Sequence, residues 1–377
     1  MAKRPTKEPA SRSAPTKKGG APRQRIAVIG PGQMGLVCAG LLTSPEPGPD
    51  GSRNNMRDKG LEVAMWGRDK DELTTLAQSR RSPRLPGYFL PREVLVCLDA
   101  AQALQGATLI VSAVPVQHTR QAWTKIAKFV PPGVGVVSVA KGIEVKTLLR
   151  PTQIIADVLA KSGRDDPDGK PRPLAALSGP TIAAELARCL PATLIAASDD
   201  PIFAARVQHL FTTSWMRVYT NSDVLGVELA GAAKNIIAIA AGVIDGLKAG
   251  NNAKSALLAR GLAEIVRLGT AMGATPDTFF GIAGAGDLAT SCFSPEGRNR
   301  TCGEALGKGE KLEDYLKRTG ATVEGVWTTK AVSKLATKYK VEMPITDTVR
   351  MALFEGLDPI AGISALMTRE KKAEKVR

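Results

Sequence analysis

Lys234 and Asn235 stand inside a strongly apolar helical pattern, with three isoleucines in the four residues that follow them. A buried ammonium group without a partner is costly, and burial lowers its pKa. A lysine in this position is therefore a candidate acid or base in a reaction. The alternative is a structural ion pair with Glu228 or Asp245 on the same helix.

Further segments have residue types that bind anions or carbonyl oxygens. Lys141 follows the apolar run 134–139, at the strand end where ligands gather in parallel sheets; a surface lysine is the alternative. Ser178-Gly179-Pro180-Thr181 follows another strand, and Thr181 is expected to open a helix, as a cap or as an anion site. Asp287 ends a glycine-rich segment, and Arg298-Asn299 in a later loop suits phosphate or a charged surface.

Gly30-x-Gly32-x-x-Gly35 lies between the β-branched run 26–29 and a helical pattern at 36–42. Glycines let the backbone turn tightly and approach a pyrophosphate, while the helix N-terminus offers free N–H groups. This context predicts a dinucleotide site, and a glycine-rich turn of another α/β protein is the alternative. Arg68, after the second strand, suits the 2′-phosphate of NADP or adenine stacking, whereas Asp69 suits the plain ribose of NAD.

The sequence pattern of the elements that position these residues changes along the chain, from alternating strands and helices to helices alone. Apolar runs at 61–66, 109–114, 134–139, 174–177 and 193–197 alternate with helical patterns, as in a parallel sheet covered on both faces, and 216–219 is expected to close it. Residues 222–247 and 252–272 read as long buried helices. We expect a Rossmann-like dinucleotide-binding domain over 25–220 and a helical substrate domain over 221–368, an α/β plus all-α fold.

The chain has 377 residues and a net charge of +15. Residues 1–25 contribute +7 and residues 369–377 contribute +3, so the basic excess lies mainly in the tails. We interpret 1–24 as a disordered basic tail, with a targeting segment as the alternative, and 369–377 as a second basic tail; 44–60 and 161–173 are interpreted as polar surface insertions. Nucleic-acid binding, a metal site and a disulfide framework are not expected, and no apolar run approaches the roughly 18 residues of a membrane span.

Together these segments resemble NAD(P)-dependent glycerol-3-phosphate dehydrogenase of the soluble bacterial type. The matching pieces run in order over about residues 25–360 and include Gly30–Gly35, Trp66-Gly67-Arg68, Ala113-Val114-Pro115, Lys141-Gly142-Ile143-Glu144, Ser178-Gly179-Pro180, Lys234-Asn235, Asp287-Leu288, Arg298-Asn299-Arg300 and Val323-Glu324-Gly325. The family's fold is a Rossmann-like domain followed by a helical domain of the 6-phosphogluconate dehydrogenase type, which agrees with the two domains expected from the sequence pattern.

The resemblance implies the interconversion of dihydroxyacetone phosphate and sn-glycerol 3-phosphate with NADPH or NADH, which supplies glycerol 3-phosphate for phospholipid synthesis. It assigns the catalytic roles to Lys234, Lys141 and Asp287. The implied substrate contacts are these three residues with Gly179, Thr181, Ser291, Arg298 and Asn299. The implied cofactor contacts are Gly30, Gly32, Gln33, Met34, Gly35, Arg68, Lys141, Ala183, Arg298 and Glu324. A cytoplasmic homodimer is the expected form.

Two residues depart from the family pattern. Met34 stands where an aromatic residue is usual, and Gly297 stands where the phosphate loop usually has a serine hydroxyl. One rival enzyme is a two-domain dehydrogenase of 3-hydroxy acids, against which Arg298-Asn299 favours a phosphate substrate. The rival of another class is a nonenzymatic NADPH sensor or a nucleic-acid-binding protein, in which Lys234 and Asp287 would have no purpose.

Overall fold

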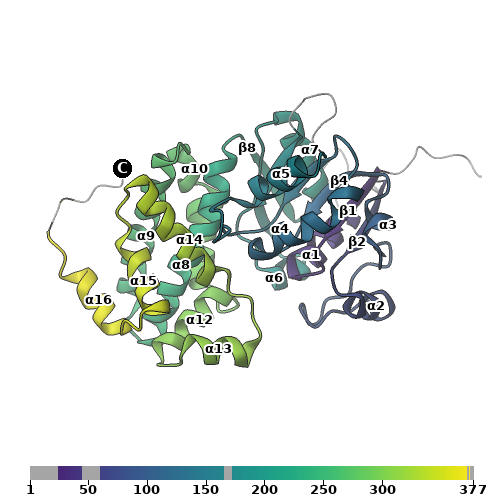
Figure 1. Cartoon of the computed structure of the whole chain (residues 1–377). Coiled ribbons are helices and arrows are strands. Elements are labelled where there is room, and N and C mark those ends of the chain that lie inside the picture. Colours follow the sequence, from purple (N-terminus) through teal and green to yellow (C-terminus); the bar gives the residue numbers. More distant parts are fainter. Residues whose placement is uncertain (1–23, 45–59, 165–171, 372, 374–377) are drawn as a thin grey trace, which may run out of the picture.

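A computed structural model describes residues 24–44, 60–164, 172–371 and 373. The basic tail before residue 24, most of both insertions and most of the second tail lie outside these residues. Figure 1 shows two halves side by side, a sheet half coloured purple to teal and a helical half coloured green to yellow.

The described residues of the sheet half form one eight-stranded sheet in the order β3-β2-β1-β4-β5-β6-β7-β8. Each predicted apolar run is a strand, and a short extra strand, β3, lies at one edge. The bounds are β1 Gln24–Ile29, β2 Leu61–Trp66, β3 Leu95–Val96, β4 Ala107–Ser112, β5 Gly135–Ser138, β6 Leu174–Ser178, β7 Ala192–Ala197 and β8 Met216–Asn221.

The sheet departs from the expected parallel arrangement at β7, which pairs with β6 in the antiparallel sense. The chain between them holds only a short helix, α6 (Ala183–Ala187), whereas β8 then pairs with β7 in parallel after the longer α7 (Pro201–Phe211). A parallel connection usually runs back along the sheet as a helix, and the five-residue α6 is much shorter than the eleven-residue α7, which suits an antiparallel return.

Two helical layers cover the sheet. Apolar side chains of α1 (Gln33–Thr43), α6 and α7 pack on one face, and those of α3 (Ala100–Leu104), α4 (Val116–Ile126) and α5 (Pro151–Lys161) pack on the other. Strands buried on both faces explain the continuous apolar runs. A further helix, α2 (Lys70–Ser79), follows β2 and begins at the side-chain cap of Asp69.

The helical half is built around α8 (Val224–Gly246), whose apolar residues form the centre of the largest core cluster. By length and composition α8 is the one helix among the described residues that could cross a membrane, yet most of it is buried inside the protein. The prediction that no apolar run approaches the length of a membrane span is therefore wrong for α8. The remaining helices of this half are α9 Asn251–Ala271, α10 Pro276–Phe280, the π-helix η3 Ile282–Gly286, α11 Asp287–Phe293, α12 Arg298–Gly307, α13 Leu312–Thr319, α14 Glu324–Tyr339, α15 Pro344–Phe354 and α16 Pro359–Met367.

Helices α8 and α12 approach closely because small residues line their contact. A Cβ atom on Gly303 would lie 1.9 Å from the carbonyl oxygen of Ile239, and one on Gly242 would lie 1.9 Å from that of Arg300. Only glycine fits at such a distance from backbone atoms. This packing fixes the start of α12, with Arg298 and Asn299, relative to α8, which carries Lys234.

Candidate active site

One buried carboxylate holds two lysines together. The Nζ atom of Lys141 donates to Oδ2 of Asp287 at 2.7 Å, and Nζ of Lys234 donates to Oδ1 of the same residue at 2.7 Å. Asp287 is only 1% exposed, so its carboxylate oxygens meet the two lysines out of bulk water. Two ammonium groups on one carboxylate leave a net positive charge at this point, which suits a substrate on which negative charge develops.

The three side chains come from three different elements. Lys141 follows the carboxyl end of β5, a central strand of the sheet, Lys234 lies in the middle of α8, and Asp287 is the first residue of α11. Directly before Asp287 the chain forms the π-helix η3, a wider turn that often marks functional sites. The site therefore lies where the sheet half meets the helical half.

The proposed structural partners of Lys234 are wrong. Glu228 pairs instead with Arg150, and Asp245 pairs with Lys254 and Arg300. The partner is Asp287, which is 53 residues further along the chain.

Two hydroxyl groups complete the surroundings of the lysines. Lys141 also donates to the carbonyl oxygen of Gly179 at 2.8 Å and to Oγ1 of Thr181 at 3.0 Å, while Lys234 donates to Oγ of Ser291 at 2.5 Å. Thr181 does not open a helix as predicted, because α6 begins two residues later, at Ala183. The Thr181 hydroxyl accepts a hydrogen bond from Lys141 instead.

Burial lowers the pKa of Lys141 to about 8, and the positive charge of Lys234 acts in the same direction. The negative charge of Asp287 opposes both effects. The ordinary lysine pKa is about 10.4, so Lys141 loses its proton far more readily than a surface lysine does. Such a shift, caused by burial and a like charge, is typical of functional sites.

Asn299 and Arg298 begin α12 beside this cluster. The Nδ2 atom of Asn299 donates to Oδ1 of Asn235 at 2.9 Å, and Oδ1 of Asn299 accepts from the backbone amide of Gly325 at 2.8 Å. Asn299 thus links α12 to α8 and α14 while keeping one N–H and one lone pair for a ligand. Arg298 is exposed, and its positive charge acts on the buried carboxyl of Glu324.

Glu324, at the start of α14, is a buried carboxyl with one oxygen, Oε2, that lacks a hydrogen-bond partner. Burial raises its pKa to about 7, against the opposing effects of Arg298 and the backbone amide of Val116. A Cβ atom on Gly142 would lie 3.3 Å from Oε2, so this oxygen lies beside the segment that carries Lys141. An unsatisfied buried oxygen beside the segment that follows β5 fits a ligand donor at this point.

The β1–α1 turn has the geometry that a dinucleotide requires. Gly30 has φ +107, and a Cβ atom there would lie 2.7 Å from the carbonyl oxygen of Ala113, while one on Gly35 would lie 1.8 Å from that of Gly30. Nothing lies within 4 Å of a Cβ built on Gly32, and no side chain caps α1. The N-terminal amides of α1 therefore face open space, where a pyrophosphate fits.

The other cofactor candidates occupy the same half of the molecule. Gln33 donates to the carbonyl oxygen of Arg84 at 2.8 Å, and Met34 packs partly buried against the sheet core. Ala183 is buried in that core, at the start of α6. Arg68 is exposed after β2, and its guanidinium lies 3.5 Å from Oε1 of Gln121 on α4. Among the described residues, none of these four has a hydrogen bond or ion pair with Lys141, Lys234 or Asp287.

Sequence reasoning missed the residues that hold the segment around Lys141. Gln117 and Arg120 contact this segment from α4, at positions three residues apart on one helix face. The sequence signal that could have identified them is a pair of polar residues three positions apart, directly after the strand end Ala113-Val114-Pro115.

Comparisons with known proteins agree with this geometry. A family model described as the N-terminus of NAD-dependent glycerol-3-phosphate dehydrogenase matches residues 25–204, and the model of its C-terminus matches residues 223–364. A glycerol-3-phosphate dehydrogenase [NAD(P)+] of Lactobacillus delbrueckii subsp. bulgaricus is 42% identical over 350 residues, which are 93% of this chain and 98% of that protein. The Pelotomaculum thermopropionicum enzyme of the same name is 40% identical, over 93% of this chain and 95% of its own length.

A solved structure shows the same fold. The crystal structure of glycerol-3-phosphate dehydrogenase from Coxiella burnetii superposes with a TM-score of 0.82 at 33% identity, covering 92% of this chain and 99% of that one. The two family models together cover most of the chain, including both lysines and Asp287. The chain is therefore a member of the NAD(P)-dependent glycerol-3-phosphate dehydrogenase family.

Proposed function

We propose that this chain reduces dihydroxyacetone phosphate to sn-glycerol 3-phosphate, with Lys234 donating the proton to the substrate oxygen. The observation that carries this proposal is the pair of ammonium groups on Asp287. NADPH or NADH, when bound, supplies the hydride to the ketone carbon, which leaves negative charge on the oxygen. A nearby ammonium stabilises that charge and gives up its proton.

The other side chains have supporting roles in this proposal. Lys141 adds positive charge beside the reacting oxygen, and Asp287 keeps both ammonium groups in place. Thr181 accepts a hydrogen bond from Lys141 and Ser291 accepts one from Lys234, so both hydroxyl groups lie beside the reacting oxygen in this proposal. Gly179 supports it through its carbonyl oxygen.

Phosphate recognition falls to the start of α12 in this proposal. Arg298 and Asn299 hold the substrate phosphate, and Gly297, which caps α12 without a side-chain bond, offers only its backbone. Binding a remote phosphate positions the carbonyl for reaction. The proposed cofactor contacts are Gly30, Gly32, Gln33, Met34, Gly35, Arg68, Lys141, Ala183, Arg298 and Glu324.

The experiment follows NADPH oxidation by the purified protein with dihydroxyacetone phosphate and, separately, with dihydroxyacetone. We expect kcat/KM to be lower by at least about 100-fold without the phosphate, because its binding energy no longer positions the carbonyl. Equal efficiency with both ketones would exclude the assigned role of Arg298 and Asn299. No turnover with either would exclude the activity.

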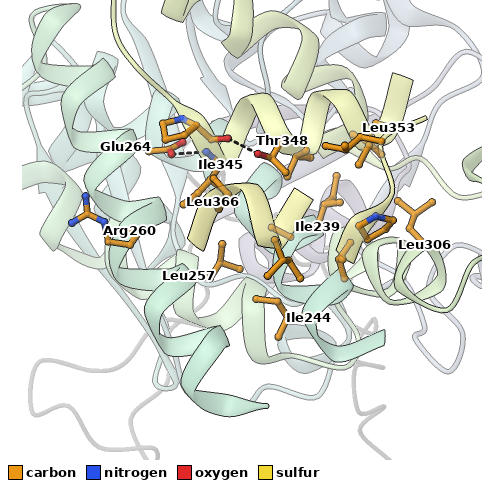
Figure 2. A pocket seen from close by; sticks show the side chains of 18 of the residues that line it. Ile239, Ile244, Leu257, Arg260, Glu264, Leu306, Ile345, Thr348, Leu353 and Leu366 are labelled. Atoms are coloured by element: carbon orange, nitrogen blue, oxygen red, sulfur yellow. Dashed lines mark hydrogen bonds between the residues drawn. The ribbon is translucent and has the colours of Figure 1, made fainter. Parts of the chain in front are cut away.

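We further propose a cytoplasmic homodimer built on the outer face of the helical half. Figure 2 shows side chains that line a hollow in this half, including apolar ones of α8, α9, α15 and α16 such as Ile239, Leu257, Leu353 and Leu366. Beside it, α16 exposes Ile360 at 64% and Met367 at 81%. The rim carries both signs of charge, including Arg267 and Glu342. A face with a protruding apolar helix, an apolar hollow and mixed charges suits a second copy of itself.

A further inference from the structure

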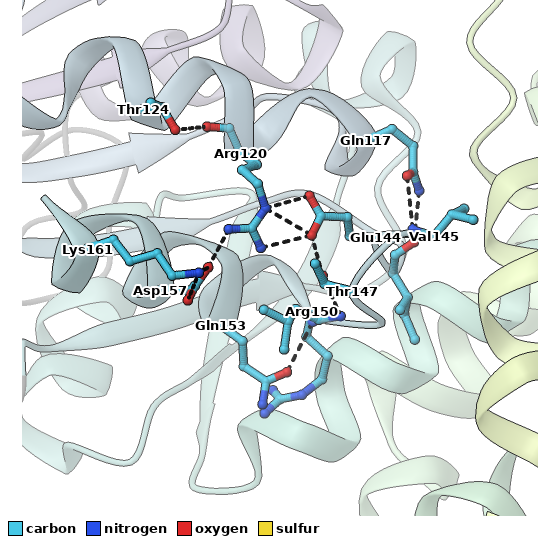
Figure 3. A network of polar contacts seen from close by, with 12 residues as sticks. Gln117, Arg120, Thr124, Glu144, Val145, Thr147, Arg150, Gln153, Asp157 and Lys161 are labelled. Atoms are coloured by element: carbon cyan, nitrogen blue, oxygen red, sulfur yellow. Dashed lines mark hydrogen bonds and ion pairs between the residues drawn. The ribbon is translucent and has the colours of Figure 1, made fainter. Parts of the chain in front are cut away.

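The segment 139–150, which carries Lys141, contains neither helix nor strand between the end of β5 and the start of α5. A lysine whose Nζ must stay on Asp287 needs a backbone that does not move. The contacts that fix this segment come largely from one face of α4 (Figure 3). We use the name loop clasp for the three residues Gln117, Arg120 and Glu144.

Gln117, in the first turn of α4, holds the backbone on both sides of Glu144. Its Nε2 atom donates to the carbonyl oxygen of Ile143 at 2.8 Å, and its Oε1 atom accepts from the amide of Val145 at 3.2 Å. The carboxamide thus acts on the segment as a neighbouring strand would. These bonds lie two and four residues after Lys141, so they fix the backbone directly beside it.

Arg120, one turn further along α4, binds the side chain of Glu144. Its Nε atom donates to Oε1 at 3.0 Å, and its Nη2 atom donates to Oε2 at 2.9 Å. Glu144 is only 6% exposed, and Arg120 also pairs with Asp157 on α5. A two-pronged arginine–carboxylate pair has a defined geometry, which a lysine in place of arginine would not give.

The far end of the segment is attached to the helix that carries the second lysine. Glu228 on α8 accepts from the amide of Thr152 at 2.9 Å and from its hydroxyl at 2.7 Å, and it pairs with Arg150. Glu228 lies less than two turns before Lys234. The segment therefore has one attachment on α4 and one on α8, which set Lys141 and Lys234 at a fixed separation.

We infer that the loop clasp is a positioning device for catalysis: Gln117, Arg120 and Glu144 act on the reaction only through Lys141. This inference rests on the proposed function, in which Lys141 adds positive charge at the reacting oxygen. The clasp residues themselves are positioning residues, since no described contact joins them to Lys234, Asp287 or Ser291. A misplacement of about 1 Å caused by a distant residue can cost about 100-fold in rate.

A double-mutant cycle tests the inference. The proteins are the wild type, Gln117→Ala, Lys141→Met and the double variant, and the measurement is kcat at saturating dihydroxyacetone phosphate and NADPH. We expect Gln117→Ala to lower kcat by about 10- to 100-fold in the wild type. In the Lys141→Met background it should change kcat by no more than about twofold, because residues that act through one another are not additive.

A matched control separates positioning from stability. Gln208 on α7 makes the same kind of bond to a neighbouring backbone, from Nε2 to the carbonyl oxygen of Val218 at 2.8 Å, far from Lys141 in the fold. Gln208→Ala should lower Tm about as much as Gln117→Ala while leaving kcat unchanged. If Gln117→Ala does not fold, Glu144→Gln, which keeps the side-chain size, takes its place in the double-mutant cycle with Lys141→Met.

The possible failures are distinguishable. An equal loss of kcat from Gln117→Ala in both backgrounds, or no loss in either, would overturn the inference about the clasp. A Lys141→Met protein with wild-type kcat would overturn it too, by removing the residue through which the clasp acts. An inactive wild type would instead overturn the proposed function.

Discussion

Asp287 is the residue on which the charges of the site depend. Its two oxygens are each occupied by a lysine Nζ, so neither lysine can lose its place without leaving half of a buried carboxylate unpaired. Breaking a buried pair in this way is strongly destabilising. In the proposed reaction, the third N–H of Lys234, beside those that bind Asp287 and Ser291, is the donor for the substrate oxygen.

Lys234→Met tests the assigned proton donor. The change keeps much of the side-chain length and leaves Asp287 paired with Lys141, so we expect a lower Tm but a folded protein, which far-UV circular dichroism checks. We expect kcat to fall by roughly 10²–10⁴-fold, as is typical when a general acid is lost. Cofactor affinity, measured by fluorescence titration, should change little because the glycine turn lies on the sheet half.

Lys254→Met is the matched control for this variant. Lys254 is also a buried lysine of the helical half, paired with Asp245 rather than Asp287. Its removal should leave kcat close to that of the wild type. A folded Lys234→Met protein with normal turnover would transfer the proton-donor role to Lys141.

Arg68→Ala tests which cofactor the site accepts. Arg68 is exposed at the end of β2, and only NADPH carries a 2′-phosphate for it to bind. We expect the KM for NADPH to rise by about tenfold and the KM for NADH to stay within about twofold, consistent with one charge-assisted hydrogen bond. Arg81→Ala, another exposed arginine of the sheet half, should change neither constant. Equal changes in both KM values would show that Arg68 does not bind the phosphate.

At the scale of elements, Glu264 of α9 connects two helices through a buried carboxyl. Its Oε1 atom accepts from the amide of Ile345 at 2.7 Å, and Oε2 accepts from the amide of Thr346 at 3.2 Å, at the start of α15. Burial nevertheless raises the pKa of Glu264 to about 7, since it outweighs these bonds. The folded protein thus binds this proton more tightly than the unfolded chain does.

The sign of the resulting pH dependence follows from linkage. Between the unfolded pKa of about 4.3 and the folded pKa of about 7, the folded state holds more protons, so stability falls as the pH rises. We expect Glu264 to contribute a loss on the order of 2–3 kcal/mol in the free energy of unfolding from pH 5 to pH 8. Urea unfolding at both pH values measures it. Glu264→Gln should lessen the pH dependence by this amount, and an unchanged difference between the two pH values would contradict the assignment.

Elements with a repeated apolar pattern were predictable from the sequence. β1, β2, α8 and α9 follow directly from runs and periodicity, and the glycine turn follows from its position between strand and helix. The antiparallel pairing of β7 was not predictable, because strand direction depends on how the short α6 connection packs. Likewise, the sequence marked Lys234 as unusual but not its partner, since Asp287 reaches it only after α11 has packed on α8.

At the scale of the whole molecule, the proposed homodimer depends on α16, the helix that exposes Ile360 and Met367. Replacing Ile360 and Met367 by Glu places charge on the exposed apolar side of this helix. We expect the wild type to be a dimer and the double variant a monomer by light scattering after size-exclusion chromatography. A buried unpaired carboxylate at the interface costs more than the apolar contact it replaces.

Ile202→Glu is the control for this prediction. Ile202 is 81% exposed on α7, in the sheet half, and its charge should leave the dimer intact. A monomeric wild type, or a double variant that stays dimeric, would show that α16 is not the interface.

The central position of α8 has a consequence for the synthesis of this chain. The helix leaves the ribosome before any of α9, α11, α12 or α14, which supply much of the apolar surface that later covers it. Before α9 and the later helices have been made, only the start of this helix, which is as apolar as a membrane span, has a surface to pack on, at β6 and β7. The buried side chains of Glu228 and Lys234 differ in this respect: Arg150, the partner of Glu228, has already been synthesised, while Asp287, the partner of Lys234, has not. A chain released just after Gly246 would therefore expose most of the apolar surface of α8, and exposed apolar surface of this kind makes an incompletely folded chain prone to aggregation.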